Sequence, residues 1–234
     1  MRFVGREAEQ RRLLGEFTRG GQNASLVYGR RRVGKSELIL HCLRQVPGTT
    51  IYYECRQTSA EKNVKGLSEV ISEAFDLPPL AFADAEATFD YVFKRSIEEK
   101  VVLVIDEYPY LRKTVKGIDS VLQVLLDTYR ENSNLSLVLC GSYVEVMKSL
   151  LEKDNPLYGR LDLKINLRPM DYYEAALFYP GFSAADKVRL YSVFGGIPYY
   201  NRLIDQSSSV RENLMRLIVE PDSRLEDEVS SYLL

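Results

Sequence analysis

Residues 29–36 read Gly-Arg-Arg-Arg-Val-Gly-Lys-Ser and match the spacing G-x-x-x-x-G-K-[ST]. Glycines at both ends of such a loop let backbone N–H groups come close to phosphate oxygens. The ammonium of Lys35 would add a point charge for the β- and γ-phosphates, and the hydroxyl of Ser36 is a ligand for Mg²⁺. The pattern therefore predicts a triphosphate site. The alternative, a Gly-rich turn that only caps a helix, is weaker because of what surrounds the loop.

A second group of residues that could do chemistry is the acidic pair Asp106-Glu107. The pair lies within the apolar run 101–111 and ends the strand that is predicted at the start of that run. Parallel α/β sheets bind ligands at the carboxyl ends of their strands, so Asp106 would face the phosphate loop. An Asp there can hold the Mg²⁺ shared with Ser36, and the neighbouring Glu107 can orient a water against the γ-phosphate. Taken alone, the two acids would more simply mark a strand end in solvent; the loop upstream favours the site.

The elements around these residues alternate between strands and helices. Residues 25–28 read as a buried strand before the loop, and residues 37–46 place apolar side chains on one face of a helix after it. The positive end of that helix adds to the attraction for phosphate. The remaining pattern predicts further strands and helices: strands at 49–55, from 135 and at 163–167, and helices from Arg6 to the Gly20-Gly21 pair, at 58–75, from 84 and at 118–129.

Two further polar groups near the expected site have two interpretations each. Arg30, Arg31 and Arg32 could contact phosphate or nucleic acid, although a solvated loop tip is the favoured interpretation. Ser142 follows the strand that starts at residue 135, where it would serve equally well as a helix N-cap or as a polar group that senses the γ-phosphate. His41, the only histidine, is expected to pack or to lie at the surface rather than to act in catalysis.

Composition excludes several classes of protein. With 234 residues and 45% hydrophobic content, the chain suits a soluble globular protein of one large domain, or of one large domain with a small appendage. The 31 basic and 33 acidic residues nearly balance, so net charge does not indicate a nucleic-acid or membrane partner. The cysteines Cys42, Cys55 and Cys140 lack metal-ligand spacing and fall in patterns that look buried. Without a signal peptide or an apolar run of membrane-spanning length, the sequence predicts a cytoplasmic protein.

From Pro169 onward the pattern changes to short helices without strands. Asp171 with Glu174 and Ser183 with Asp186 predict two helix starts, and Pro198 suits the first position of a third helix. The tyrosines in this region are expected to pack rather than to form a stacking surface for bases. Residues from Ser223 on predict one more helix, whose apolar side chains need a partner, so we expect the natural protein to be longer.

Together, the segments FVGRE, YGRRRVGKSE, VVLVIDEYPYL, LVLCGS, PLYGR and GGIPYY resemble AAA+ ATPases, in particular the archaeal-type family close to the STAND and origin-recognition branches. The resemblance covers residues 3 to about 218. It implies a P-loop NTPase fold: an α/β domain with a five-stranded parallel sheet in the order 5-1-4-3-2, flanked by helices, over residues 1–168. A small helical lid would occupy residues 169–219, and residues 220–234 would start a further helix.

The resemblance also implies which residues bind ATP or ADP with Mg²⁺. Lys35 with Ser36 would be the Walker A pair, Asp106 with Glu107 the Walker B pair, and Ser142 would take the sensor position. Residues Val4, Gly5 and Arg6 would approach the adenine and Pro198 would help to place the lid over it. The expected nucleotide contacts of the loop are Gly29, Arg30, Arg31, Arg32, Val33, Gly34, Lys35, Ser36 and Glu37.

Arg160 matches the position of the family's arginine finger, which would complete the site of a neighbouring subunit in a homo-oligomer. The alternative is a surface or structural arginine. The leading hypothesis is thus a Mg²⁺-dependent ATPase, slow as an isolated monomer, that couples hydrolysis to rearrangement of its lid and subunits. A nucleotide-gated switch that rarely hydrolyses ATP is the second hypothesis. A P-loop kinase for small molecules is the third, and the Asp106-Glu107 pair argues against it.

Overall fold

The computed structural model of this chain describes residues 3–225. These residues form two compact units: a larger one of residues 7–31 and 35–167, and a smaller one of residues 3–6, 32–34 and 168–225. Within the phosphate loop, residues 29–31, 35 and 36 therefore belong to the larger unit. Residues 32–34 are grouped with the smaller unit.

A five-stranded parallel sheet forms the centre of the larger unit, in the order β2-β3-β4-β1-β5. This confirms the strand order expected from the sequence. The three central strands are buried along their whole length because helices cover both faces of the sheet, which explains their uninterrupted apolar runs. The strands are β1 (Asn23–Tyr28), β2 (Thr49–Glu54), β3 (Val101–Asp106), β4 (Leu135–Gly141) and β5 (Leu163–Asn166).

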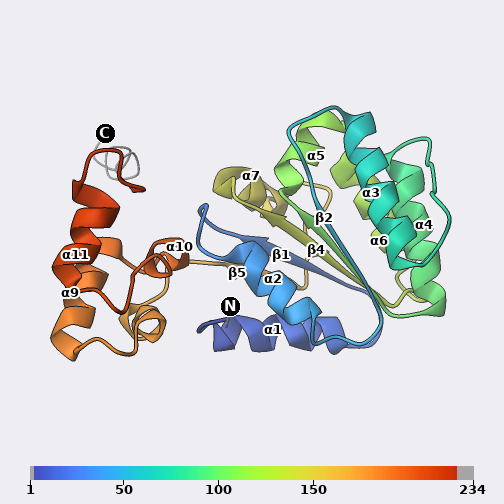
Figure 1. The fold of residues 1–234 in the computed structure, drawn as a ribbon. Helices are drawn as coiled ribbons and strands as arrows, with labels where there is room; N and C mark the ends of the chain where they lie inside the picture. Colours follow the sequence, from blue (N-terminus) through green and yellow to red (C-terminus); the bar gives the residue numbers. More distant parts are fainter. Residues whose placement is uncertain (1–2, 226–234) are drawn as a thin grey trace. The chain divides into compact units, whose positions relative to one another are not determined.

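Two groups of helices cover this sheet. Figure 1 shows α1 and α2 on the side away from α3, α4 and α6, with the sheet between the two groups. The second group packs on Leu26, Leu103 and Leu137 in one continuous apolar core. The helices of this unit are α1 (Glu7–Thr18), α2 (Lys35–Leu43), α3 (Ala60–Ala74), α4 (Ala85–Glu98), α5 (Tyr108–Thr114), α6 (Ile118–Thr128), α7 (Val144–Lys148) and a 3₁₀ turn (Ser149–Leu151).

Helix α5 was not anticipated from the sequence, which suggested an apolar run continuing through residue 111. Glu107 adopts a left-handed backbone conformation with φ of 48°, and α5 begins at the next residue. Left-handed backbone is unfavourable for a residue with a Cβ atom. The turn therefore ends β3 abruptly at Asp106 and sends the two neighbouring acids in different directions.

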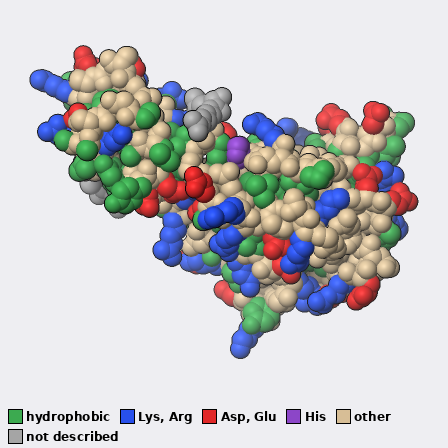
Figure 2. Space-filling model, turned by 90° about the horizontal axis from the view of Figure 1, so that it is seen from below, with side chains coloured by type: hydrophobic (Ala, Val, Ile, Leu, Met, Phe, Trp, Pro, Cys, Tyr) green, Lys and Arg blue, Asp and Glu red, His purple; other side chains and the backbone are tan. Residues whose placement is uncertain are grey.

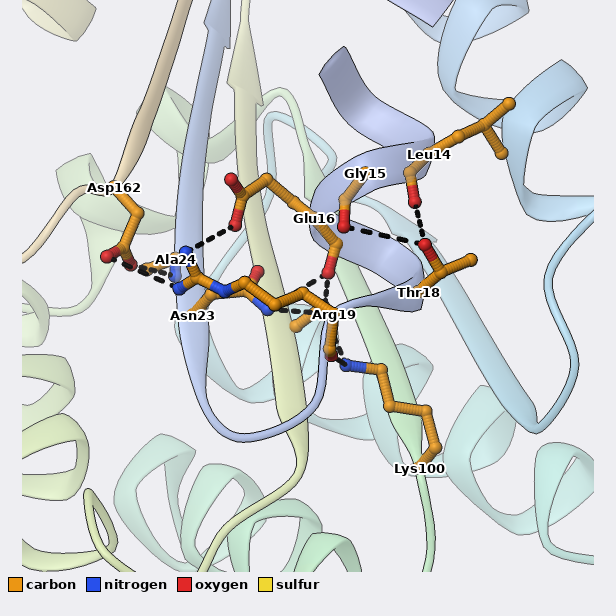
Figure 3. A network of polar contacts seen from close by, with 10 residues as sticks. Leu14, Gly15, Glu16, Thr18, Arg19, Asn23, Ala24, Lys100 and Asp162 are labelled. Carbon is orange, nitrogen blue, oxygen red and sulfur yellow. Dashed lines mark hydrogen bonds and ion pairs between the residues drawn. The ribbon is translucent and has the colours of Figure 1, made fainter. Parts of the chain in front are cut away.

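At the amino ends of the strands, a polar network fastens α1 to β1 (Figure 3). Asn23 donates to the backbone oxygen of Glu16 at 3.0 Å, and Lys100 donates to that of Arg19 at 2.9 Å. The carboxylate of Asp162 accepts the backbone N–H of Ala24 at 2.9 Å. These bonds satisfy backbone groups of the α1–β1 connection and hold the two elements in place.

The smaller unit is helical where it has regular structure. The side chain of Asp171 accepts the N–H of Glu174 at 2.9 Å, Ser183 caps the next long helix, and Pro198 starts a third, as predicted. The helix expected from Ser223 falls largely on residues 226–234, outside the described residues. The elements are α8 (Tyr172–Ala175), a 3₁₀ turn (Ala176–Phe178), α9 (Ala184–Phe194), α10 (Pro198–Asn201), α11 (Val210–Leu214) and a π-helical turn (Met215–Val219).

The predicted burial of the three thiols is confirmed: Cys42, Cys55 and Cys140 are buried and unbridged. Burial raises the pKa of the Cys42 thiol to about 11. Between residues 3 and 225, none of the helices combines the length and the apolar character that a bilayer crossing needs.

Candidate functional site

The phosphate loop needs its two glycines for different reasons. At Gly29, a Cβ atom would lie 2.2 Å from the backbone oxygen of Leu167, too close for any side chain. At Gly34, φ is +91°, a conformation that L side chains rarely adopt. The first glycine thus permits a close approach of two backbones, and the second permits the turn into α2.

Lys35 is 6% exposed and directs its ammonium group into a set of oxygen atoms. Its Nζ donates to the backbone oxygens of Gly29 and Arg30 at 3.0 and 3.1 Å and to Ser142 Oγ at 2.9 Å. An ammonium has three donors. The structure therefore brings the predicted lysine to the predicted serine at the end of β4 and links both to the start of the loop.

Asp106 ends β3 with only 2% of its surface exposed. Its Oδ2 accepts the Ser36 hydroxyl at 2.6 Å and the Tyr52 hydroxyl, and its Oδ1 accepts the N–H of Glu107 at 2.8 Å. Burial alone would raise the pKa of Asp106, but the hydrogen bonds from Ser36, Tyr52, Cys140 and the backbone of Glu107 together outweigh burial and hold the pKa below its ordinary value. The carboxylate is therefore kept ionised, as a cation ligand must be.

Glu107 and Ser142 pair directly. Ser142 Oγ donates to Glu107 Oε1 at 2.6 Å, and the backbone N–H of Ser142 donates to Oε2 at 3.3 Å. The interpretation of Ser142 as a helix N-cap is wrong, because α7 begins after Tyr143 and has no side-chain cap. Instead, the Ser142 hydroxyl accepts from Lys35 and donates to Glu107, so it connects the loop to the acid.

The donors at this edge fit a magnesium ion. Mg²⁺ prefers oxygen ligands and usually takes one or two from the protein and the rest from phosphates and water. The hydroxyl of Ser36 and the carboxylate of Asp106 are such ligands, and their 2.6 Å contact places them at one point. Among the described residues, no three His, Cys, Asp or Glu side chains gather into a metal cluster, so an all-protein cage is not part of this site.

The loop arginines contact aromatic rings. The guanidinium of Arg31 lies 5.7 Å from the centre of the Tyr143 ring, within the larger unit. In the smaller unit, Arg32 lies 4.7 Å from the centre of the Tyr199 ring. Arg30 is exposed. Two of the three positions that the sequence favoured as a solvated tip therefore contact tyrosines.

The smaller unit holds the residues that the resemblance places near the base. The backbone N–H of Arg6 donates to Glu174 at 2.7 Å, and its guanidinium donates to the backbone oxygens of Val33 and Arg168. A Cβ atom on Gly34 would lie 3.7 Å from Pro198. Arg6 thus joins segments of the smaller unit through the carboxylate of Glu174 and the backbone oxygens of Val33 and Arg168, a structural task that the sequence did not suggest. Val4 and Gly5 precede it half-buried, and Glu37 is exposed in the first turn of α2.

Arg160 lies at the amino end of β5, at the opposite edge of the sheet from Lys35. Its guanidinium forms a two-pronged ion pair with Asp127, at 2.9 Å from Nε and 2.7 Å from Nη2. The structure therefore does not bring Arg160 to the other predicted catalytic residues of its own chain.

Sequence reasoning missed Tyr52. Its hydroxyl bonds to Asp106, yet in the sequence it is one of two adjacent tyrosines in a strand, both typical of β-structure. Successive strand residues point to opposite faces, so only one of the pair can reach the site. Tyr53 faces the other way and donates to Asn63 at 3.0 Å.

Comparison with known proteins identifies the family of this chain. Residues 3–203 match the family model of an ATPase domain found predominantly in Archaea. The chain belongs to this family. An uncharacterized protein of Methanocaldococcus jannaschii, MJECL04, is 28% identical to the ATPase domain over 199 residues, which are 85% of this chain and 43% of that protein. The chain thus spans less than half the length of this relative.

Solved structures share the fold of this ATPase domain at low sequence identity. The Walker-type ATPase PABY2304 of Pyrococcus abyssi superimposes with a TM-score of 0.69 and 19% identity, covering 99% of this chain and 75% of that one. The ORC2 protein of Aeropyrum pernix, in its ADPNP–ADP complexes, superimposes with a TM-score of 0.63 and 15% sequence identity. That match covers 97% of this chain and 63% of the ORC2 chain. The fold is therefore the P-loop NTPase fold, with a five-stranded parallel sheet flanked by helices, which confirms the fold class expected from the sequence. The family model confirms the archaeal-type ATPase family.

Proposed function

We propose that this domain binds ATP with Mg²⁺ and hydrolyses it at the carboxyl edge of the sheet. One observation supports this above all. Lys35, Ser36, Asp106, Glu107 and Ser142 come from the phosphate loop and two strand ends and join in hydrogen-bonded contact. This constellation supplies a cation for phosphate, oxygen ligands for a metal and a carboxylate for water.

Each side chain has a role that follows from its position. Lys35 would exchange a loop carbonyl for a phosphate oxygen and offset the charge of the terminal phosphates. Glu107 would accept a proton from the attacking water, whose oxygen bonds to the γ-phosphorus while the bond from that phosphorus to the β–γ bridging oxygen breaks, giving ADP and phosphate. Ser142 would hold the Glu107 carboxylate in reach of that water. When bound, Mg²⁺ would neutralise phosphate charge, and Ser36 and Asp106 would hold it.

The helical segment 169–219 would act as a lid for the nucleotide. Support comes from the composition of the smaller unit, which includes residues 32–34 of the phosphate loop as well as Arg6 and Pro198. A nucleotide bound by the loop would bias the arrangement of the segments that share this unit. This coupling, the cytoplasmic location and the domain boundaries are parts of the proposal.

Glu107→Gln tests the hydrolytic role. The amide keeps the size of the side chain but is a poor base, so phosphate release should fall by about 10²- to 10⁴-fold while the affinity for ATP stays within a few-fold. Glu145→Gln, a change at an exposed acid that pairs with Lys148, is the matched control and should leave both quantities unchanged. Undiminished phosphate release from Glu107→Gln would remove Glu107 from the mechanism.

Arg160 is proposed to act in the site of a neighbouring copy. Its place at the far edge from Lys35 supports action between chains rather than within one, and an arginine finger raises turnover by about 10³- to 10⁵-fold. Turnover per chain should then rise with protein concentration, and Arg160→Ala should abolish that rise. Turnover independent of concentration in the intact protein would exclude the finger and leave Arg160 as a partner of Asp127.

A nucleotide-gated switch is the second candidate, favoured by the way Glu107 is held. Both of its carboxylate oxygens accept hydrogen bonds from Ser142, which opposes rapid activation of water. A switch would retain nucleotide through purification and release phosphate at a negligible rate at every protein concentration. Measurable turnover that Glu107→Gln abolishes would favour the ATPase instead.

A further inference from the structure

A cavity of about 320 Å³ opens beside the candidate site in the larger unit, between α5 and α7. Its apolar lining comes from Pro109, Tyr110, Tyr143 and Val146, and its basic lining includes Lys113. None of these residues has a role in the proposed hydrolysis. The cavity therefore needs an explanation of its own.

Two tyrosines form an aromatic platform in this cavity. Tyr143 is 43% exposed, and its ring meets that of Tyr110 edge to face, with the ring centres 5.8 Å apart. Their hydroxyls lie 3.3 Å apart. A large, exposed ring that a second ring supports keeps a fixed orientation, and aromatic rings of this kind can stack with a flat ligand.

The charge around the platform is positive. Lys113 is exposed, and the Arg31 guanidinium lies over the Tyr143 ring, 5.7 Å from its centre, and donates to the Tyr143 hydroxyl at 3.5 Å, so a base and Arg31 would share this ring. Arg112 also lines the cavity, with its Nε bound to Asp119 at 2.8 Å. Within the described residues, no Asp or Glu lines this cavity. On the face seen in Figure 2, basic side chains are scattered beside acidic ones. The near balance of 31 basic and 33 acidic residues in the whole chain does not reveal the positive lining of this cavity.

We propose that this cavity binds single-stranded nucleic acid, with a base against Tyr143 and the adjoining phosphates near Lys113 and Arg31. Sequence-tolerant binding of single strands combines stacking on aromatic rings with cations along the backbone. A duplex keeps its base faces covered by stacking and cannot use the platform. A proline-rich peptide could contact the rings but carries no regular negative charge for the cations.

The platform is connected to the nucleotide site through the chain itself. Tyr143 directly follows Ser142, and the N–H of Tyr110 donates to the backbone oxygen of Glu107 at 3.0 Å. Arg31 belongs to the phosphate loop. A strand on the platform would therefore change the affinity for ATP, and ATP would change the affinity for the strand by the same factor. This coupling rests on the proposed function, whereas the binding itself does not.

The test measures fluorescence anisotropy of a labelled oligonucleotide of about 15 thymidines, a length that matches known single-strand sites. It is run first without nucleotide, so that binding is judged apart from ATPase function. Tyr143→Leu should weaken binding by about 5- to 150-fold, the cost of losing one stacked base. Tyr158→Leu is the matched control, because Tyr158 is 47% exposed and lies outside the cavity. Lys113→Gln should weaken binding and flatten its salt dependence, while Lys116→Gln should not.

An abasic oligonucleotide of the same length separates stacking from charge. It should bind the intact protein about as weakly as oligothymidine binds Tyr143→Leu. Equal affinity for the two oligonucleotides, or equal effects of Tyr143→Leu and Tyr158→Leu, would overturn the proposal, as would preference for a proline-rich peptide. Binding of the strand with no change on adding Mg²⁺-ATP would uphold the site and refute only the coupling.

Discussion

The two edges of the central sheet contain the same kinds of residue, but these residues have different roles. At the carboxyl edge, Lys35 donates to two backbone oxygens and to Ser142. At the amino edge, Lys100 donates to the backbone oxygen of Arg19 and to the hydroxyl of Ser136. Lys35 is buried and Lys100 is half-buried, and each contacts a serine at a strand end, so this pairing is not by itself a sign of function.

The difference lies in what the serine does next. Ser136 Oγ donates to the backbone oxygen of Glu16 in α1, so the amino-edge network ends in the backbone. Ser142 Oγ donates to the carboxylate of Glu107, which a left-handed turn has separated from Asp106. At the amino edge, the polar groups form hydrogen bonds that hold α1 on the sheet. The carboxyl edge leaves side chains facing one another where parallel sheets bind ligands.

Replacing the two lysines should give the largest contrast between the edges. Lys35→Ala removes an ammonium that is expected to contact phosphate, so the affinity for ATP should fall by about 10- to 150-fold, the range for hydrogen bonds to charged groups. Lys100→Ala should leave the affinity unchanged. Isothermal titration with ATP and Mg²⁺ measures both, and equal losses in the two variants would refute the assignment of function to one edge.

The adjacent tyrosines of β2 provide a finer contrast. Tyr52→Phe removes one hydrogen bond from Asp106, whereas Tyr53→Phe removes a bond to Asn63 away from the site. We expect Tyr52→Phe to raise the Mg²⁺ concentration needed for half-maximal binding of a fluorescent ATP analogue by about 2- to 10-fold. Binding of the analogue in excess chelator should not change.

Tyr53→Phe should leave the Mg²⁺ midpoint unaltered while lowering the thermal stability. If both variants shift the midpoint equally, the effect comes from general loosening of β2, and Tyr52 does not position the metal ligand.

The carboxyl edge was largely predictable because its residues are tied to the chain's local pattern. A glycine loop between a strand and a helix leaves few alternatives, and a strand that ends in two acids must present one of them at the same edge. Three strands followed from apolar runs and the strand at 49–55 from its β-branched and aromatic residues; residues 163–167 were a fifth candidate, and the strand order followed from the resemblance. Helix caps such as Asp171 and Ser183 were also predictable, because their hydrogen bonds span only three residues.

The contacts that were missed depend on register and on partners distant in sequence. Which of Tyr52 and Tyr53 faces Asp106 depends on how β2 pairs with β3, and either assignment suits a strand. The partner of Lys100 is a backbone oxygen 81 residues away, for which side-chain patterns carry no signal. The left-handed turn at Glu107 was hidden because glutamate rarely adopts it, so strain at the site was invisible in the sequence.

The smallest expected effect concerns the charge on Lys100. Burial, together with the nearby Arg19 guanidinium, lowers the pKa of Lys100 below its ordinary value of 10.5. In the folded protein its proton is therefore held less tightly than in the unfolded chain, and charging this lysine opposes folding. Between the lowered pKa and 10.5 the unfolded state binds more protons, so stability should rise with pH across that window.

Urea unfolding of the intact protein and of Lys100→Met across the alkaline pH range measures the contribution of Lys100 titration to stability, because the other titrating groups are common to both proteins. The free energy of unfolding of the intact protein minus that of the variant should increase as pH rises toward 10.5. Loss of the hydrogen bonds to Arg19 and Ser136 shifts the variant by a constant amount and leaves the slope intact. A difference that stays flat, or that falls with pH, would mean that Lys100 is as well solvated as a surface lysine, and the amino edge would then be less tightly closed than its contacts indicate.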